Sequence, residues 1–91
     1  MAIMIQIPSA LRAECGGVSE LPTSAATVRK ALDQLEETHP ALYRSVCDDT
    51  GAVRRHVNVF VNDVCLDRRG GLGQKLEPGD VLTIMPAVSG G

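Results

Sequence analysis

The sequence predicts an α+β fold in which one main helix packs on one face of a mixed β-sheet. Apolar and polar residues alternate in "IMIQIP" and again in "HVNVFVND", as they do in half-buried strands. Between these stretches, "SAATVRKALDQLEETHP" repeats its apolar residues with helical spacing. Because a single helix can cover only one face of a sheet, we expect two layers.

The first half of the chain is expected to form two strands and the main helix. The isoleucines of "IMIQIP" point to one side of a strand that ends at Pro8, "ECGG" predicts a turn, and "VSEL" predicts a short antiparallel strand. Thr27 is suited to cap the helix, because its hydroxyl can satisfy an amide of the first turn. Pro40 disfavours helical geometry at His39 and should end the helix there. "ALYRSV" can add a short second helix.

The second half is expected to form three strands. The polar stretch "CDDTGAVRR" predicts an exposed loop, and "HVNVFVND" is a strand that turns at Asn62 and Asp63 into the returning strand "VCL". "GGLGQKL" predicts a loop or single turn, "EPGD" a tight turn, and "VLTIMP" the last strand. We expect the first and last strands to be parallel neighbours at the centre of the sheet, as in a β-grasp.

The alternation also separates a core face from an open face. The predicted core consists of Ile3, Ile5, Ile7, Val28, Leu32, Leu35, Val57, Val59, Val61, Leu82 and Ile84. Met4, Phe60 and Met85 fall on the opposite face, where no helix remains to cover them. Exposed apolar groups of this kind often mark a partner surface. The alternative is that a loop within residues 40–55 folds over them.

Composition limits the classes of function. The chain has 91 residues, a net charge of -2, one Phe and one Tyr, which disfavours a nucleic-acid-binding surface. No apolar run is long enough for a membrane span, and no signal peptide is recognisable, so we expect a cytoplasmic protein. The three cysteines are odd in number and widely spaced, which favours incidental thiols over a disulfide or metal site.

The chain closes on "MPAVSGG", which suggests a functional end. Glycine loses more conformational freedom on ordering than any other residue, so a terminal Gly-Gly adds nothing to a core. We therefore expect a folded domain at residues 1–86 and a flexible tail at residues 87–91. A slender chain end of this kind can enter a narrow site on another protein.

The stretches "VNVFVND" and "EPGDVLTIMPAVSGG", with a helix between two strand pairs, resemble the ubiquitin-like prokaryotic sulfur carriers. That family includes the small subunit of molybdopterin synthase and the thiamine-biosynthesis sulfur carrier, and it has the β-grasp fold. "RRHVNVFVND" and "PAVSGG" are most similar to its cysteine-biosynthesis type. Two departures are Ser89, where such carriers often have Ala, and His56, where the residue is often aromatic.

The resemblance implies that the chain is a sulfur-carrying substrate of other enzymes and is not itself an enzyme. An E1-like enzyme would use ATP to adenylate the Gly91 carboxylate, which is then converted to a thiocarboxylate. An acceptor enzyme, cysteine-synthase-like or from a natural-product pathway, would take the sulfur. The chain itself would bind no cofactor and no metal. The residues expected to contact partners are Ala87, Val88, Ser89, Gly90, Met4, Phe60 and Met85.

Two other uses of an activated terminal glycine stay open, namely a small subunit of molybdopterin synthase and a ubiquitin-like protein modifier. A structural adaptor with an idle Gly-Gly end is a further alternative. His39 is expected at the surface. His56, beside Arg54 and Arg55, is expected on a solvated basic edge, and the alternative is a contact with an acidic partner surface. Asp48 and Asp49 lack the further oxygen ligands of a metal loop. No pair of residues suits nucleophilic or acid–base catalysis.

Overall fold

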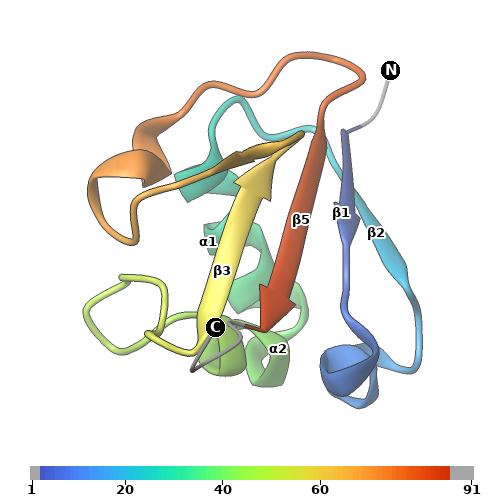
Figure 1. Cartoon of the computed structure of the whole chain (residues 1–91). Coiled ribbons are helices and arrows are strands. Elements are labelled where there is room, and N and C mark those ends of the chain that lie inside the picture. Colours follow the sequence, from blue (N-terminus) through green and yellow to red (C-terminus); the bar gives the residue numbers. More distant parts are fainter. Residues whose placement is uncertain (1–2, 87–91) are drawn as a thin grey trace.

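The computed structural model describes residues 3–86, which form one five-stranded mixed sheet with two α-helices on one of its faces (Figure 1). In chain order the elements are β1 (Ile3–Gln6), the 3-10 helix η1 (Ser9–Cys15), β2 (Glu20–Thr23), α1 (Val28–Thr38), α2 (Pro40–Val46), β3 (Val57–Val61), β4 (Val64–Cys65), the 3-10 helix η2 (Gly70–Gly73) and β5 (Val81–Pro86). The predicted α+β architecture with a β-grasp sheet is confirmed.

The sheet has the strand order β2-β1-β5-β3-β4. β1 and β5 run parallel to each other, with Ile5 opposite Leu82. The other neighbours are antiparallel: β2 pairs with β1, β3 with β5, and β4 with β3. The predicted parallel pairing of the first and last strands at the centre is therefore confirmed. No helix within residues 3–86 is long and apolar enough to cross a membrane.

Helix α1 begins and ends where the sequence predicts. The Thr27 hydroxyl accepts a hydrogen bond from the Lys30 amide at 3.2 Å, so it caps the first turn. The helix ends before Pro40, and the His39 amide donates to the Leu35 carbonyl at 2.7 Å. The buried side of the helix consists of Val28, Ala31, Leu32 and Leu35.

The core lies between the sheet and the two helices. Every residue predicted for the core is buried. Helix α2 adds Leu42, Tyr43 and Val46, and it packs against both α1 and η1. Burying one such aliphatic side chain contributes roughly 1.5–3 kcal/mol, so α2 is a substantial part of the core and not merely a connection.

The structure corrects the prediction for residues 47–55, which were expected to form an exposed loop. Cys47, Ala52 and Val53 in this segment are buried. The chain folds back on itself because the Asp48 carboxylate accepts hydrogen bonds from the amides of Thr50, at 2.9 Å, and Ala52, at 3.2 Å. Two smaller differences are the 3-10 helix η1, which was not predicted, and the later start of β2 at Glu20.

Two turns join the strands around β5. Asn62 has a φ of 53° at the β3–β4 hairpin, and Gly79 has a φ of 91° in the "EPGD" turn, a region that favours glycine. The Asp80 carboxylate accepts hydrogen bonds from the Glu77 amide at 2.8 Å and from the Asn62 side-chain amide at 3.2 Å. Asp80 therefore links the hairpin to the turn that begins β5.

We predict that Thr27→Ala destabilises the protein through loss of the helix cap. Removing a Thr N-cap costs about 1 kcal/mol in the free energy of unfolding, with a range of roughly 0.5–2. Urea unfolding followed by circular dichroism measures the change, and Ser24→Ala, at an exposed position just before the helix, is the control. Equal stability of the two variants would contradict the capping role.

A second prediction concerns the pH dependence of stability. The Glu77 amide and then the Asn62 side chain hold the pKa of the Asp80 carboxyl below its usual value. A group with a lowered folded-state pKa stabilises the fold above its unfolded pKa, about 3.9, and loses that contribution as the pH falls through its folded pKa. The stability advantage of the wild type over Asp80→Asn should therefore be present at pH 7 and shrink as the pH falls from about 4 towards 2.

Urea unfolding at several pH values tests this prediction. Asp63→Asn is the matched control, because the Asp63 carboxylate accepts no side-chain hydrogen bond within residues 3–86. A difference between wild type and Asp80→Asn that stays constant from pH 7 to pH 2 would show that the carboxylate charge is irrelevant to this turn.

Candidate functional site

The strand that leads to the predicted carrier residues is the central strand of the sheet. β5 lies between β1 and β3 and ends at Pro86, opposite Val57. Hydrogen-bonded ladders on both sides hold β5, so they fix the point from which the chain continues. The predicted tail residues Ala87, Val88, Ser89, Gly90 and Gly91 lie outside the described residues, and so does the expectation that they are flexible.

The sheet face opposite the helices carries the apolar residues that were predicted to contact partners. Met4 on β1 lies opposite Val81 on β5, and Phe60 on β3 lies opposite Thr83 on β5. Residues that are paired in register point to the same side of a sheet, and alternate residues along a strand share that side. Met85 therefore lies on the same face as Met4, Val81, Phe60 and Thr83.

These apolar side chains form one continuous row. In the register, Phe60 is the diagonal neighbour of both Val81 and Met85, and diagonal neighbours lie within reach of an aromatic side chain. Val81, which the sequence analysis did not single out, thus joins Met4 to Phe60. We call Met4, Val81, Phe60 and Met85 the apolar stripe. Met85 is 47 % exposed, and the other three are half-buried.

No helix or strand within residues 3–86 covers the apolar stripe. The alternative, that residues 40–55 fold over it, is wrong, because residues 40–46 form α2 on the other side of the sheet (Figure 1). Residues 47 to 53 then pack against the core on that same side, with Cys47 and Val53 buried and paired in a bridge. The stripe is therefore available to another molecule.

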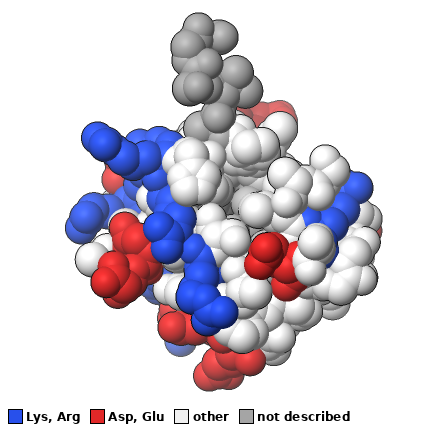
Figure 2. Space-filling view, turned by 90° about the horizontal axis from the view of Figure 1, so that it is seen from below, with Lys and Arg blue, Asp and Glu red and all other residues white. Residues whose placement is uncertain are grey.

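A hollow of about 300 Å³ lies at the edge of the molecule where β5 ends. Figure 2 looks onto this edge and shows a stripe of Lys and Arg side chains along one side of it. The hollow is lined by Ala10, Leu11, Ser45, Arg54, His56, Val57 and Pro86. Because Pro86 belongs to the lining, the hollow borders the point from which the chain continues to its last residues.

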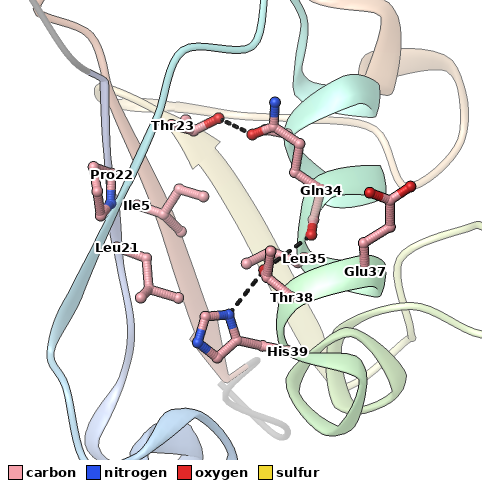
Figure 3. A pocket seen from close by; sticks show the side chains of 10 residues that line it. Ile5, Leu21, Pro22, Thr23, Gln34, Leu35, Glu37, Thr38 and His39 are labelled. Carbon is pink, nitrogen blue, oxygen red and sulfur yellow. Dashed lines mark hydrogen bonds between the residues drawn. The ribbon is translucent and has the colours of Figure 1, made fainter.

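A second pocket, of about 240 Å³, lies between β2 and α1, away from the apolar stripe (Figure 3). The Thr23 hydroxyl donates a hydrogen bond to the Gln34 side-chain oxygen at 2.6 Å, and the Thr38 hydroxyl lies 2.9 Å from His39 Nδ1. These polar groups are already engaged with one another. The pocket offers apolar walls from Ile5 and other residues, and it brings together no reactive groups.

The thiols and histidines do not assemble a catalytic centre within residues 3–86. Cys15 and Cys47 are buried and Cys65 is exposed, and all three are free. The pKa of the Cys47 thiol is raised, because the effect of burial exceeds the opposing effect of the neighbouring Arg29. The reactive thiolate is therefore disfavoured. In the same part of the chain, no group of three or more His, Cys, Asp or Glu side chains could hold a metal ion.

Sequence reasoning missed two features of this region. Val81 could have been found by continuing the alternation of "VLTIMP", which places Val81 and Met85 on the same side. The sequence predicts a basic edge at Arg54 and Arg55, but it does not show which other arginines join them. Arg44 and Arg68 are linked to Arg54 from segments far apart in the sequence, and periodicity within one segment carries no signal for such a meeting.

Comparison with known proteins gives consistent matches. The family model described as the ThiS family matches residues 5–91. Sulfur carrier protein CysO from Mycobacterium tuberculosis (strain ATCC 25618 / H37Rv) is 33% identical over 93 residues, which cover 100% of both chains. Small archaeal modifier protein 1 from Haloferax volcanii is 42% identical over 66 residues, which cover 72% of this chain and 71% of that protein.

A similar solved structure is described as the Amycolatopsis orientalis BexX/CysO complex. A chain of that structure superposes with a TM-score of 0.85 at 36% identity, and the match covers 99% of this chain and 100% of that chain. The likeness therefore extends over the sheet, the helices and the order of the elements. Together with the match of the family model, it shows that the chain belongs to the ThiS family.

Proposed function

We propose that this protein is a sulfur carrier, which other enzymes load and unload and which catalyses no reaction itself. The observation that carries the proposal is the full-length similarity to sulfur carrier protein CysO, in which both chains are covered completely. The family match, which extends to Gly91, supports the terminal glycine as the loading site.

The proposed chemistry takes place at the Gly91 carboxylate. A carboxylate is a poor electrophile, because its oxygens share a negative charge and neither leaves readily. An E1-like enzyme would let it attack the α-phosphorus of ATP, which releases pyrophosphate and forms an acyl-adenylate. A sulfur donor then displaces AMP and leaves a thiocarboxylate on Gly91. ATP is thus a substrate of the activating enzyme and not a cofactor of this chain.

The length and composition of residues 87–91 suit this role. A fully extended chain spans roughly 3.3–3.6 Å per residue, so five residues can reach about 17 Å beyond the sheet. Gly90 and Gly91 have no Cβ, which lets the backbone pass a narrow channel and approach a phosphate closely. The central position of β5 gives this reach a fixed origin at Pro86.

The apolar stripe would supply docking affinity. Ordering the last residues in an active site costs roughly 1–2 kcal/mol per residue in backbone entropy. Phe60 and Met85 can offset that cost, because aromatic residues and methionine are enriched in the cores of protein interfaces. We infer a division of labour in which the sheet face binds the enzyme and the terminal residues undergo the chemistry.

We propose two classes of partner, both in the cytoplasm. The first is the E1-like adenylating and sulfur-transferring enzyme, and the second is a sulfur-acceptor enzyme that makes cysteine or another sulfur-containing metabolite. That a CysO chain of Amycolatopsis orientalis was crystallised in complex with BexX supports partner binding by chains of this fold. We expect Ala87, Val88, Ser89 and Gly90 to contact these enzymes as the end is inserted.

A ubiquitin-like protein modifier is the second candidate function. It is favoured by the 42% identity to small archaeal modifier protein 1 from Haloferax volcanii. In that case Gly91 would form an isopeptide bond with a lysine of a target protein. Conjugates of high molecular weight on an immunoblot, formed with ATP and the activating enzyme, would identify this activity.

We predict that incubation with the E1-like enzyme, ATP and a sulfur source adds about 16 Da to the protein, since sulfur replaces one oxygen. Intact-mass spectrometry measures the change, and fragmentation must place it at the C-terminus because methionine oxidation has the same nominal mass. Deleting Gly91 should reduce thiocarboxylate formation by about a hundredfold or more, since a small misplacement of a reacting group can cost that much.

Val64→Ala, at an exposed position of β4 outside the expected enzyme contacts, is the control for this deletion and should be loaded normally. Appending one tryptophan after Gly91 should block loading as the deletion does. Undiminished sulfur transfer from the shortened or the extended chain would overturn the proposed function.

Phe60→Ala should weaken binding to the activating enzyme by about tenfold or more, the usual effect of truncating an aromatic interface anchor. The KM for the carrier should rise, while the rate of thiocarboxylate formation at saturation stays close to that of the wild type. Val64→Ala is the control, because Val64 is 64% exposed and does not belong to the apolar stripe. It is the cross-strand partner of Val61, so it points to the helix-covered side of the sheet. Unchanged KM for Phe60→Ala would refute docking through the stripe.

A further inference from the structure

Hydrogen bonds from two arginine side chains to backbone carbonyls link four arginines from three separate segments, and one of them, Arg54, lines the hollow at the end of β5. Arg54 Nε donates a hydrogen bond to the Arg44 carbonyl at 2.6 Å, and Arg68 Nε donates to the Arg54 carbonyl at 3.3 Å. Arg68 also donates through Nη2 to the Arg55 carbonyl. These bonds tie α2, the segment before β3 and the segment after β4 together. We call Arg44, Arg54, Arg55 and Arg68 the arginine cluster.

The charges of this cluster are not neutralised within the described part of the chain. The one ion pair within 4.0 Å among residues 3–86 joins Arg29 to Asp33 on α1, at 3.3 Å. The protein nevertheless carries a net charge of -2. The cluster therefore carries positive charge without an ion-pair partner among residues 3–86 on a weakly acidic molecule, and Figure 2 shows a stripe of Lys and Arg side chains, with Asp and Glu side chains beside it, on this edge.

Two nearby carboxylates, Asp67 and Asp48, are engaged in their own turns, and two more, Glu36 and Asp49, line a pocket together with Arg44 and Arg54. Asp67 accepts hydrogen bonds from the amides of Arg69, at 3.2 Å, and Gly70, at 2.8 Å. The Gly70 amide is the main cause of the lowered pKa of Asp67, and the charge of Arg68 is a minor one. Asp48 is held in the same way by Thr50. Asp67 and Asp48 thus close their own turns, and no carboxylate among residues 3–86 forms an ion pair within 4.0 Å with an arginine of the cluster.

The hollow lies against the cluster and gives it an apolar centre. Arg54 belongs to both, and Ser45, next to Arg44, lines the hollow. The walls include Leu11, Val57 and Pro86. An apolar cavity with a charged rim is the arrangement in which a buried anchor supplies affinity and the surrounding charges supply specificity and association rate.

We propose that the arginine cluster and the hollow bind an acidic segment of the enzyme that receives the terminal residues, with one apolar side chain of that segment seated in the hollow. The proposal rests on the proposed function, because it takes the partner to be the activating enzyme. Its location supports this partner, since an enzyme that draws in the chain after Pro86 must lie against this edge.

A protein partner fits this edge better than a nucleic acid does. Nucleic-acid surfaces combine basic groups with aromatic side chains on which bases stack. The chain has one Phe and one Tyr. Neither offers a stacking surface at this edge, because Phe60 lies in the apolar stripe and Tyr43 is a buried residue of α2. The net charge of -2 would also oppose a polyanion that lies along the molecule.

The test measures association of the full-length protein with the E1-like enzyme of the same organism by stopped flow. Arg55→Glu is the informative variant, because Arg55 is exposed and its side chain makes no hydrogen bond within residues 3–86. The association rate constant at low salt should fall by about tenfold, the scale of electrostatic steering between charged surfaces. The deficit should shrink in about 0.5 M NaCl, where the Debye length is only a few ångströms.

Lys30→Glu is the matched control, since it makes the same change in net charge on an exposed position of α1. It should slow association much less than Arg55→Glu. Ala10→Phe, which partly fills the hollow from its exposed rim, should raise the dissociation constant by about tenfold at both salt concentrations. Urea unfolding should show that all three variants stay folded.

Three results would overturn the proposal. One is an equal slowing by Arg55→Glu and Lys30→Glu, which would reflect net charge alone. Another is an unchanged association rate for Arg55→Glu. The third is tight binding of poly-uridylate that Arg55→Glu abolishes while enzyme association stays normal, which would assign the cluster to nucleic acid. Each result leaves the proposed function standing as long as the wild type still acquires its thiocarboxylate.

Discussion

The parallel pairing of β1 with β5 is the constraint on which the rest of the structure depends. It places the last strand in the middle of the sheet, between β1 and β3, so that the chain leaves the fold from its most firmly held element. A parallel pair needs a crossover connection, and here the crossover contains α1, α2, β3 and β4. The segments that connect these two neighbouring strands therefore supply most of the core residues.

The same constraint makes the two faces of the sheet unequal. The crossover helices α1 and α2 lie on one face, where they bury Leu32, Leu42 and Val46 completely. The other face receives nothing from residues 3–86, yet it carries Phe60 and Met85. An apolar side chain on an uncovered face contributes little to folding, so these residues are better explained by binding. The face proposed for docking thus includes residues of the strand that leads to the chain end, Val81 and Met85.

Periodicity explains which parts of this fold the sequence predicts. In β1, β3 and α1 the core residues recur with the spacing of the element, so the position of each element and its buried side follow from the local pattern. The Thr27 cap and the turn at Gly79 follow from residue chemistry. Burial of Cys47 and Val53 could not be predicted, because a short hydrogen-bonded turn at Asp48, in an otherwise polar segment, folds them inward. Val81 was missed although its alternation was visible, and residues 87–91 lie outside what the structure describes.

The arginine cluster is an arrangement that local sequence patterns reveal only in part, because its residues come from separate segments of the chain. Arg54 and Arg55 adjoin each other in the chain, but Arg44 and Arg68 approach them only because α2 and the segment after β4 reach the same edge. The apolar stripe and the cluster then differ in physical role. Apolar burial is short-ranged and slows dissociation, whereas charge acts over about a Debye length and speeds encounter. If the carrier visits two enzymes in turn, as we propose, it needs rapid encounter as well as release, and a fold that separates these two contributions on different surfaces would meet both requirements.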